Sequence, residues 1–167
     1  MDDPSWLKRA RAYLGMSETP GPKHAPFITK WLDKLKAPFR DDETAWCGSF
    51  VGGVLDEDGR GYIKNPWGAR NWLKFGNPIT RPAVGAIVVF WRGSINGWSG
   101  HVGFIVGKDK AGNLMVLGGN QGDAVSIAPF SRARVLGYRW PSIAPLDERY
   151  NLPVIDSRGQ PLSTNEA

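Results

Sequence analysis

Three residues in this sequence have side chains that together could perform nucleophilic catalysis. Cys47 is the only cysteine of the chain, and His101 is one of two histidines, the other being His24. Asn120 lies in the stretch Gly-Gly-Asn-Gln-Gly. A thiolate can attack a carbonyl carbon, an imidazole can take the thiol proton, and a side-chain amide can orient the imidazole. The three residue types therefore indicate cysteine chemistry, and a single cysteine leaves no internal disulfide.

The residues around Cys47 predict a helix whose first turn holds the thiol. Apolar residues recur there at helical spacing, namely Trp46, Cys47, Phe50, Val51, Val54 and Leu55. The acidic stretch 41–44 precedes them and suits a helix N-terminus. A helix N-terminus favours negative charge and so lowers the pKa of a thiol. The alternative is a small buried apolar residue, which is the commonest role of a lone cysteine.

His101 opens a predicted strand over 101–106, and a turn at 107–112 leads to a second strand over 114–117. If this hairpin is centred near residue 110, His101 lies opposite residue 119, and Asn120 is one step away. Asn120 could then accept a hydrogen bond from one imidazole nitrogen and leave the other facing Cys47.

Two alternatives remain open for this hairpin. Gln121 or Asp123 would replace Asn120 if the register slips, and Asn120 could instead be a turn residue in a glycine-rich loop. His101 could also be a structural histidine at the start of a strand. Its face of the strand, shared with Gly103 and Ile105, is expected to pack against a helix.

The wider pattern predicts an α+β fold, with N-terminal helices packed on an antiparallel β-sheet. Helical spacing of apolar residues covers 5–14, 27–35, 46–55 and 69–73, and strand patterns cover 86–91, 101–106, 114–117, 125–127 and 134–140. Residues 1–141 are therefore expected to form the catalytic domain. Prolines recur in residues 142–167, which predicts an irregular C-terminal tail.

Composition excludes several classes of function. The net charge of +5 favours anionic partners, although the lysines and arginines are scattered and also fit a solvated surface. No nucleic-acid partner is expected, because RNP-like strands and helix-turn-helix signals are missing. No metal or cofactor is expected, because metal-ligand spacings are missing. No apolar run approaches the roughly 18 residues that span a membrane, and the first residues do not form a signal peptide.

The sequence resembles the CHAP and NlpC-like peptidoglycan hydrolases, especially a compact group of phage-type lysins. The resemblance covers about residues 5–141, and its order of Cys, His and Asn is that of papain-like cysteine hydrolases. It rests on blocks that include Ala45-Trp46-Cys47, Arg81-Pro82, Gly85-Ala86-Ile87-Val88-Val89-Phe90, Gly100-His101-Val102-Gly103-Phe104, Leu117-Gly118-Gly119-Asn120-Gln121-Gly122 and Gly137-Tyr138-Arg139-Trp140-Pro141.

The resemblance implies a papain-like domain in which Cys47 is the nucleophile and His101 is the general base. It also implies that Asn120 is the third member of the catalytic triad, a position where these families vary between Asn, Asp and Glu. The oxyanion hole would use the backbone N–H of Cys47 and one side-chain donor. Papain-like enzymes often carry that donor as a glutamine six residues before the cysteine, where this chain has Asp41. Trp46, Trp98 and Gln121 are expected to contact substrate.

The implied function is hydrolysis of a peptidoglycan amide bond by a monomeric phage endolysin. Such a protein would be made in the cytoplasm, would not insert stably in the membrane, and would act on the wall in the periplasm after release. A secreted antibacterial amidase effector, an acyltransferase or transglutaminase-like enzyme, and a binding module without cysteine chemistry are the alternatives. The choice between N-acetylmuramoyl-L-alanine amidase and stem-peptide endopeptidase stays open.

Overall fold

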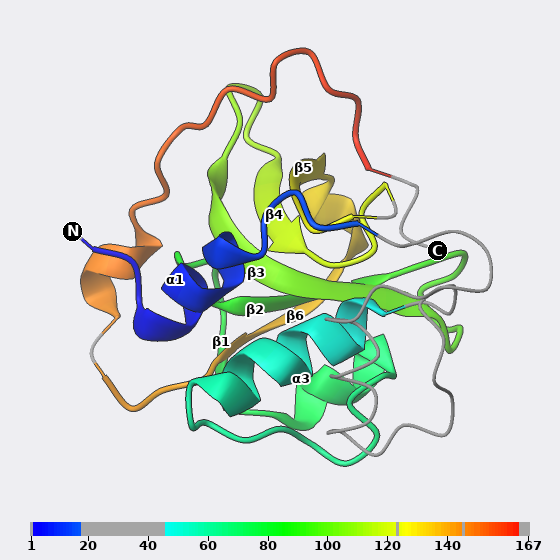
Figure 1. Cartoon of the computed structure of the whole chain (residues 1–167). Coiled ribbons are helices and arrows are strands. Elements are labelled where there is room, and N and C mark those ends of the chain that lie inside the picture. The colour runs from blue at the N-terminus through cyan, green and yellow to red at the C-terminus, as the bar shows by residue number, and fades with distance from the viewer. Residues whose placement is uncertain (1, 18–45, 123, 145, 164–167) are drawn as a thin grey trace.

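The computed structural model describes residues 2–17, 46–122, 124–144 and 146–163 (Figure 1). The predicted helix over 27–35, the acidic stretch 41–44, His24 and Asp123 lie outside the described residues. Within the described residues, no helix is long and apolar enough to cross a membrane.

A six-stranded antiparallel sheet forms the centre of the fold, with the strand order β1-β6-β2-β3-β4-β5. The strands are β1 (Asn77–Ile79), β2 (Ile87–Trp91), β3 (Gly100–Lys108), β4 (Leu114–Gly118), β5 (Ser126–Phe130) and β6 (Val135–Trp140). The sheet and the helices that precede it confirm the predicted α+β class. Sequence pattern missed only β1, because its three residues include Pro78 and it lies at the edge of the sheet, where proline is tolerated.

In the part of the chain that the structure describes, two α-helices precede the strands, namely α1 (Ser5–Ala12) and α3 (Cys47–Glu57). Figure 1 shows α3 lying across the sheet, with α1 beside it. Short 3₁₀ helices follow at η1 (Ala69–Lys74), η2 (Arg132–Arg134) and η3 (Asp147–Tyr150). The first nine residues of α3 are buried, so packing on both of its sides holds this helix in place.

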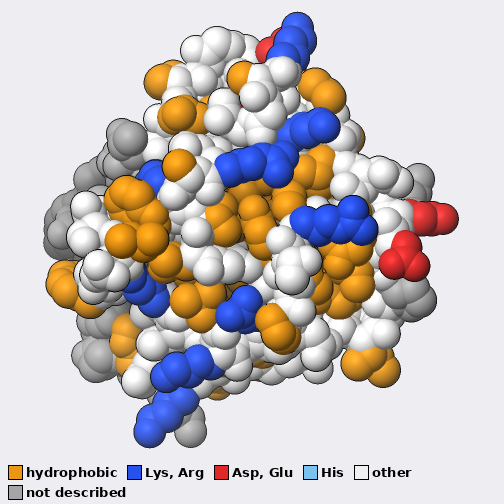
Figure 2. Space-filling view, turned by 180° about the vertical axis from the view of Figure 1, so that it is seen from behind, with side chains coloured by type: hydrophobic (Ala, Val, Ile, Leu, Met, Phe, Trp, Pro, Cys, Tyr) orange, Lys and Arg blue, Asp and Glu red, His pale blue; other side chains and the backbone are white. Residues whose placement is uncertain are grey.

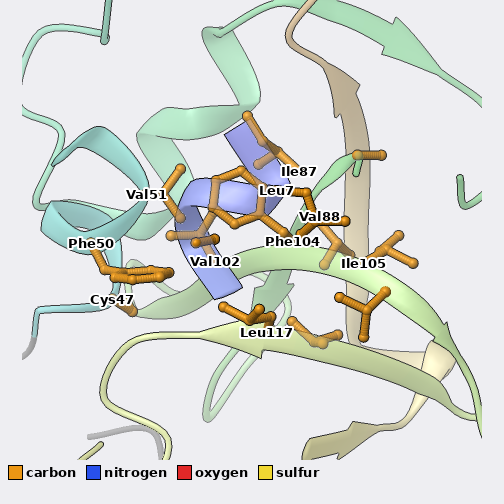
Figure 3. Packing of buried hydrophobic residues seen from close by; sticks show 14 of the residues in the cluster. Leu7, Cys47, Phe50, Val51, Ile87, Val88, Val102, Phe104, Ile105 and Leu117 are labelled. Carbon is orange, nitrogen blue, oxygen red and sulfur yellow. The ribbon is translucent and has the colours of Figure 1, made fainter. Parts of the chain in front are cut away.

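The core lies between the two helices and the sheet. Apolar side chains from α1, α3 and the strands pack there, including Leu7, Phe50, Val51, Ile87, Val102 and Phe104 (Figure 3). Burial of each large apolar side chain contributes roughly 2 kcal/mol. The ring centroids of Phe50 and Phe104 are 6.4 Å apart, edge to face, which anchors α3 on β3.

The β3–β4 hairpin has a register that differs by one residue from the prediction. Phe104 pairs with Leu117, and an irregularity after Ile105 shifts the next pair to Gly107 and Met115. Continued towards the start of β3, the observed register sets residue 120, instead of residue 119, in line with His101. A shift of one residue changes which side chains meet across a hairpin.

The C-terminal segment 146–163 winds along the edge of the molecule (Figure 1). The Lys108 N–H donates to the Pro153 carbonyl at 2.9 Å, and the Ile155 N–H donates to the Lys108 carbonyl at 2.7 Å. Further along, the Ser163 N–H donates to the Pro129 carbonyl of β5 at 2.8 Å. These bonds tie the segment to the C-terminal ends of β3 and β5.

Candidate active site

Cys47 is the first residue of α3 and is 5% exposed. Trp46 precedes it as the N-cap residue and provides no side-chain cap. The first N–H groups of a helix have no intrahelical partners, and the helix dipole there favours an anion such as a thiolate. The helix start is packed closely, because a Cβ on Gly48 would overlap the Pro66 carbonyl oxygen and lie 3.1 Å from the Trp67 backbone. The thiol is therefore held at the N-terminal end of a fixed helix.

His101 lies near the start of β3, is fully buried, and has a side-chain partner in Gln121. The distance between His101 Nε2 and Gln121 Oε1 is 2.9 Å. The amide nitrogen of Gln121 donates to the carbonyl oxygens of Val116 at 3.1 Å and Ser126 at 2.8 Å. Since the amide nitrogen is used by these carbonyls, the amide oxygen must face the imidazole and accept its hydrogen bond. This network assigns the proton of the neutral imidazole to Nε2 and leaves Nδ1 as the basic nitrogen.

Aromatic rings hold the plane of the imidazole. The His101 ring is stacked on Phe130, with centroids 5.2 Å apart and an interplanar angle of 7°. Phe90 lies 6.5 Å away at 23°. Phe104 lies on the opposite side of β3 from His101 and packs against Phe50 of α3. The helix that could have packed on the His101 face therefore lies on the other face, and the aromatic neighbours of His101 are Phe90 of β2 and Phe130 of β5.

The side chain that bonds His101 is Gln121 and not Asn120. Gln121 reaches His101 because two backbone carbonyls, of Val116 and Ser126, hold its amide nitrogen and so turn its oxygen to the imidazole. Asn120 is 2% exposed and has a φ of 59°. Its amide nitrogen has no hydrogen-bond partner among the described residues.

The dipeptide Gly118–Gly119 borders both parts of the candidate site. A Cβ on Gly118 would overlap Gln121 Oε1 and lie 3.2 Å from His101 Nε2. A Cβ on Gly119 would lie 2.7 Å from the Trp46 ring and from Phe50 Cβ. Glycine at both positions therefore lets the His101–Gln121 pair and the first turn of α3 approach the same end of β4.

The three residues expected to contact substrate have different environments. Trp46 is fully buried and packs against Gly119, so its ring is not open to a ligand in this structure. Gln121 is 4% exposed, and its amide is used by His101 and two carbonyls. Trp98, in the loop between β2 and β3, is 89% exposed.

Sequence reasoning missed Arg70, which holds the loop that carries Trp98. Its guanidinium donates to three loop carbonyls, those of Ser99 at 2.8 Å, Ile95 at 2.8 Å and Ser94 at 2.7 Å. Arginine presents a rigid fork of donors, so one side chain can fix several carbonyls. The loop is therefore preorganised, with Trp98 and the 56% exposed Ile95 directed to solvent. No short motif marks such a contact between η1 and a distant loop.

A cavity of about 210 Å³ adjoins Gln121. Its walls come from the segment after β4, from β5 and from the C-terminal segment 160–163. A larger cavity of about 530 Å³, lined by Asp3, Arg11, Val84, Val106 and Glu148 among others, includes none of the candidate site residues. Among the described residues, no cluster of His, Cys, Asp and Glu could hold a metal ion.

Comparison with known proteins finds one family model that matches part of this chain. The family model of the CHAP domain matches residues 39–120, a range that contains Cys47, His101 and Asn120. No curated protein matches the chain. The chain is similar in structure to a Staphylococcus aureus protein described as similar to a lipoprotein of the NLP/P60 family, with 15% sequence identity and a TM-score of 0.49. That similarity covers 81% of this chain and 39% of the other chain. Residues 39–120 of the chain are therefore similar to the CHAP domain, and they lie within an α+β fold.

Proposed function

We propose that this protein is a cysteine hydrolase that cleaves an amide bond of peptidoglycan, with Cys47 as nucleophile and His101 as general base. The observation that carries the proposal is the hydrogen bond between His101 and Gln121. It sets the imidazole tautomer that a cysteine hydrolase needs, with the proton on Nε2 and a basic Nδ1. Gln121 is thus the positioning residue, in the role first expected of Asn120.

The proposed reaction begins when His101 Nδ1 takes the proton of the Cys47 thiol. The thiolate sulfur attacks the amide carbonyl carbon, and the carbonyl oxygen becomes an oxyanion. The C–N bond then breaks, and the imidazolium returns its proton to the leaving amine. Water, deprotonated by His101, attacks the thioester, releases the carboxylic acid and restores the thiol. Throughout this cycle Gln121 keeps the Nε2 proton in place.

Peptidoglycan is the substrate class that the CHAP match supports. The exposed Trp98 ring, held by its preorganised loop, suits stacking on a sugar ring near the reacting bond. The net charge of +5 suits an anionic wall, and Figure 2 shows lysine and arginine side chains lying over an apolar surface on the rear face. The endolysin role, action in the periplasm and the monomeric state are part of this proposal.

A digest of purified Gram-negative peptidoglycan tests the function. We expect the wild-type protein to release fragments, and Cys47→Ala and Cys47→Ser to release none, with products identified by mass spectrometry. Free stem peptides identify an amidase, and cut stems identify an endopeptidase. A product joined to an added amine would instead support acyl transfer. Equal release by wild type and Cys47→Ala would refute the cysteine mechanism, and no release by wild type would refute the substrate.

A further inference from the structure

Asn120 has a buried side-chain amide that is not fully satisfied. Its side chain is 2% exposed, yet its amide nitrogen has no hydrogen-bond partner among the described residues. Its backbone φ of 59° lies in the left-handed region, which asparagine adopts more readily than most residues other than glycine. An unsatisfied buried donor disfavours the folded state, and such a group in a native structure calls for an explanation such as a catalytic role.

The position of Asn120 in the chain connects the two halves of the candidate site. A Cβ on Gly119, the residue before it, would lie 2.7 Å from the ring of Trp46, the N-cap residue of α3, and from Phe50 Cβ. Gln121, the residue after it, is bonded to His101. Asn120 therefore lies between a residue that borders the Cys47 helix start and a residue that orients the base.

We propose that Asn120 Nδ2 donates a hydrogen bond to the oxyanion of the tetrahedral intermediate, together with the backbone N–H of Cys47. This inference rests on the proposed hydrolase function. When the Cys47 sulfur bonds to the carbonyl carbon, the C=O electron pair moves to oxygen, and Asn120 donates to that oxygen without losing its proton. The hydrogen bond weakens again when the C–N bond breaks and the carbonyl re-forms.

This assignment supplies the donor that the sequence lacks at Asp41, since an ionised carboxylate cannot donate a hydrogen bond. A donor without a partner in the resting protein is preorganised for charge that appears only in the transition state. Ser49 Oγ is a second buried polar atom without a partner among the described residues, and it lies two positions after Cys47. Ser49 is therefore the competing donor that the test must separate.

The test measures two reactions of Cys47 in the full-length chain. The first is hydrolysis of a soluble peptidoglycan fragment that wild type cleaves. The second is alkylation by iodoacetamide, which needs the thiolate but forms no oxyanion. Asn120→Ala removes the amide, and Asn120→Gly removes it while permitting the positive φ. We expect kcat for hydrolysis to fall about 10²- to 10³-fold in both variants, with KM nearly unchanged.

The rate and pH profile of alkylation should stay at wild-type values in both Asn120 variants, because thiolate formation depends on His101 and Gln121. Gln121→Ala should slow both reactions, which separates orienting the base from binding the oxyanion. Asn65→Gly is the matched control, because Asn65 is an exposed asparagine outside the candidate site with a φ of 55°, and it should change neither rate. Thermal unfolding of each variant checks that it folds.

Three results would overturn the inference. Full hydrolysis by Asn120→Gly would show that the amide is not needed. Parallel loss of hydrolysis and alkylation in both Asn120 variants would assign Asn120 to the thiolate or to folding. Loss of hydrolysis in Ser49→Ala, with Asn120→Gly unaffected, would make Ser49 the donor. Failure of wild type to cleave any peptidoglycan would instead refute the proposed function itself.

Discussion

Gln121 shows how one side chain can set the chemistry of another. Its amide nitrogen donates to two carbonyls, so its orientation is fixed, and its oxygen then determines which nitrogen of His101 carries the proton. Asparagine and glutamine offer the same amide group and differ only by one methylene. The longer side chain lets Gln121 reach His101 from a position one residue beyond Asn120.

Substitution of Gln121 by glutamate tests this role at the residue scale. A carboxylate keeps the acceptor for His101 Nε2 but stabilises the protonated imidazole, so the acidic limb of the activity profile should move to higher pH. Gln121→Leu removes the acceptor and should lower kcat/KM about 10²-fold. The pH dependence of hydrolysis is the measurement. An unshifted profile for Gln121→Glu, with normal folding, would contradict the assignment.

The loop between β2 and β3 is held in place by Arg70, a residue of the 3₁₀ helix η1. Three carbonyls of this loop accept from the Arg70 guanidinium, and the loop ends at the strand that carries His101. Without that fork, the loop would keep bonds of its own, such as that from Ser99 Oγ to the Arg92 carbonyl at 3.1 Å, but would lose these three bonds to η1. The preorganised loop therefore presents Trp98 at low entropic cost to a ligand.

Loss of the Trp98 ring should weaken binding to insoluble peptidoglycan. A stacked ring contributes about 0.5–1.5 kcal/mol beyond burial, so Trp98→Ala should lower affinity about 3- to 10-fold in a sedimentation assay. Trp98→Phe keeps a ring and should stay near wild type. Arg70→Lys keeps the charge but not the fork, and should weaken binding in the same direction as Trp98→Ala. Wild-type affinity in Trp98→Ala would exclude this loop as a wall contact.

At the scale of the whole molecule, Asp58 joins the N-terminal helix to the end of α3. Its carboxylate accepts from Ser5 Oγ at 2.7 Å, Arg9 Nε at 2.8 Å and Arg60 Nε at 2.8 Å. Burial alone would raise the pKa of Asp58, but these hydrogen bonds outweigh burial and hold its pKa below the usual value. The ionised form is therefore the one that the folded protein stabilises.

Acid should remove this stabilisation. A pKa lowered by folding contributes stability above the unfolded value, roughly 3.9, and loses it as the pH falls through the folded pKa. Asp58→Asn should lower the free energy of unfolding at pH 7 by about 2 kcal/mol, or roughly 4–8 °C in Tm. The difference from wild type should shrink below about pH 4. Thermal unfolding at both pH values measures this.

The control for Asp58→Asn is Asp2→Asn. The side chain of Asp2 is 93% exposed, and its Oδ2 forms an ion pair with Lys8 Nζ at a distance of 4.0 Å. Surface pairs of this kind contribute little, so Asp2→Asn should change Tm by less than about 1 °C. A penalty for Asp58→Asn that is equal at pH 7 and pH 3 would show that the carboxylate charge is not the source of the stability.

Periodicity in the sequence determined most of the elements of this fold. Helical spacing of apolar residues predicted α1 and α3, and apolar runs predicted β2, β3 and β4. These patterns are visible in the sequence because an element that buries one face has apolar residues at regular spacing, and a strand that buries both faces has them in a run. The candidate chemistry was also local information, since Cys47 begins its helix and His101 lies near the start of its strand.

Only the tertiary structure decided which side chains meet. The hydrogen bond to His101 comes from Gln121 instead of Asn120, and the observed hairpin register differs by one residue from the predicted one, which changes the side chains that face each other. The contact from Arg70 to the Trp98 loop and the path of the segment 146–163 join residues far apart in the chain. Such contacts depend on distances in space, and the spacing of residues along the sequence does not give these distances. Composition and periodicity therefore identify the reacting groups, and the tertiary structure determines which side chains contact them.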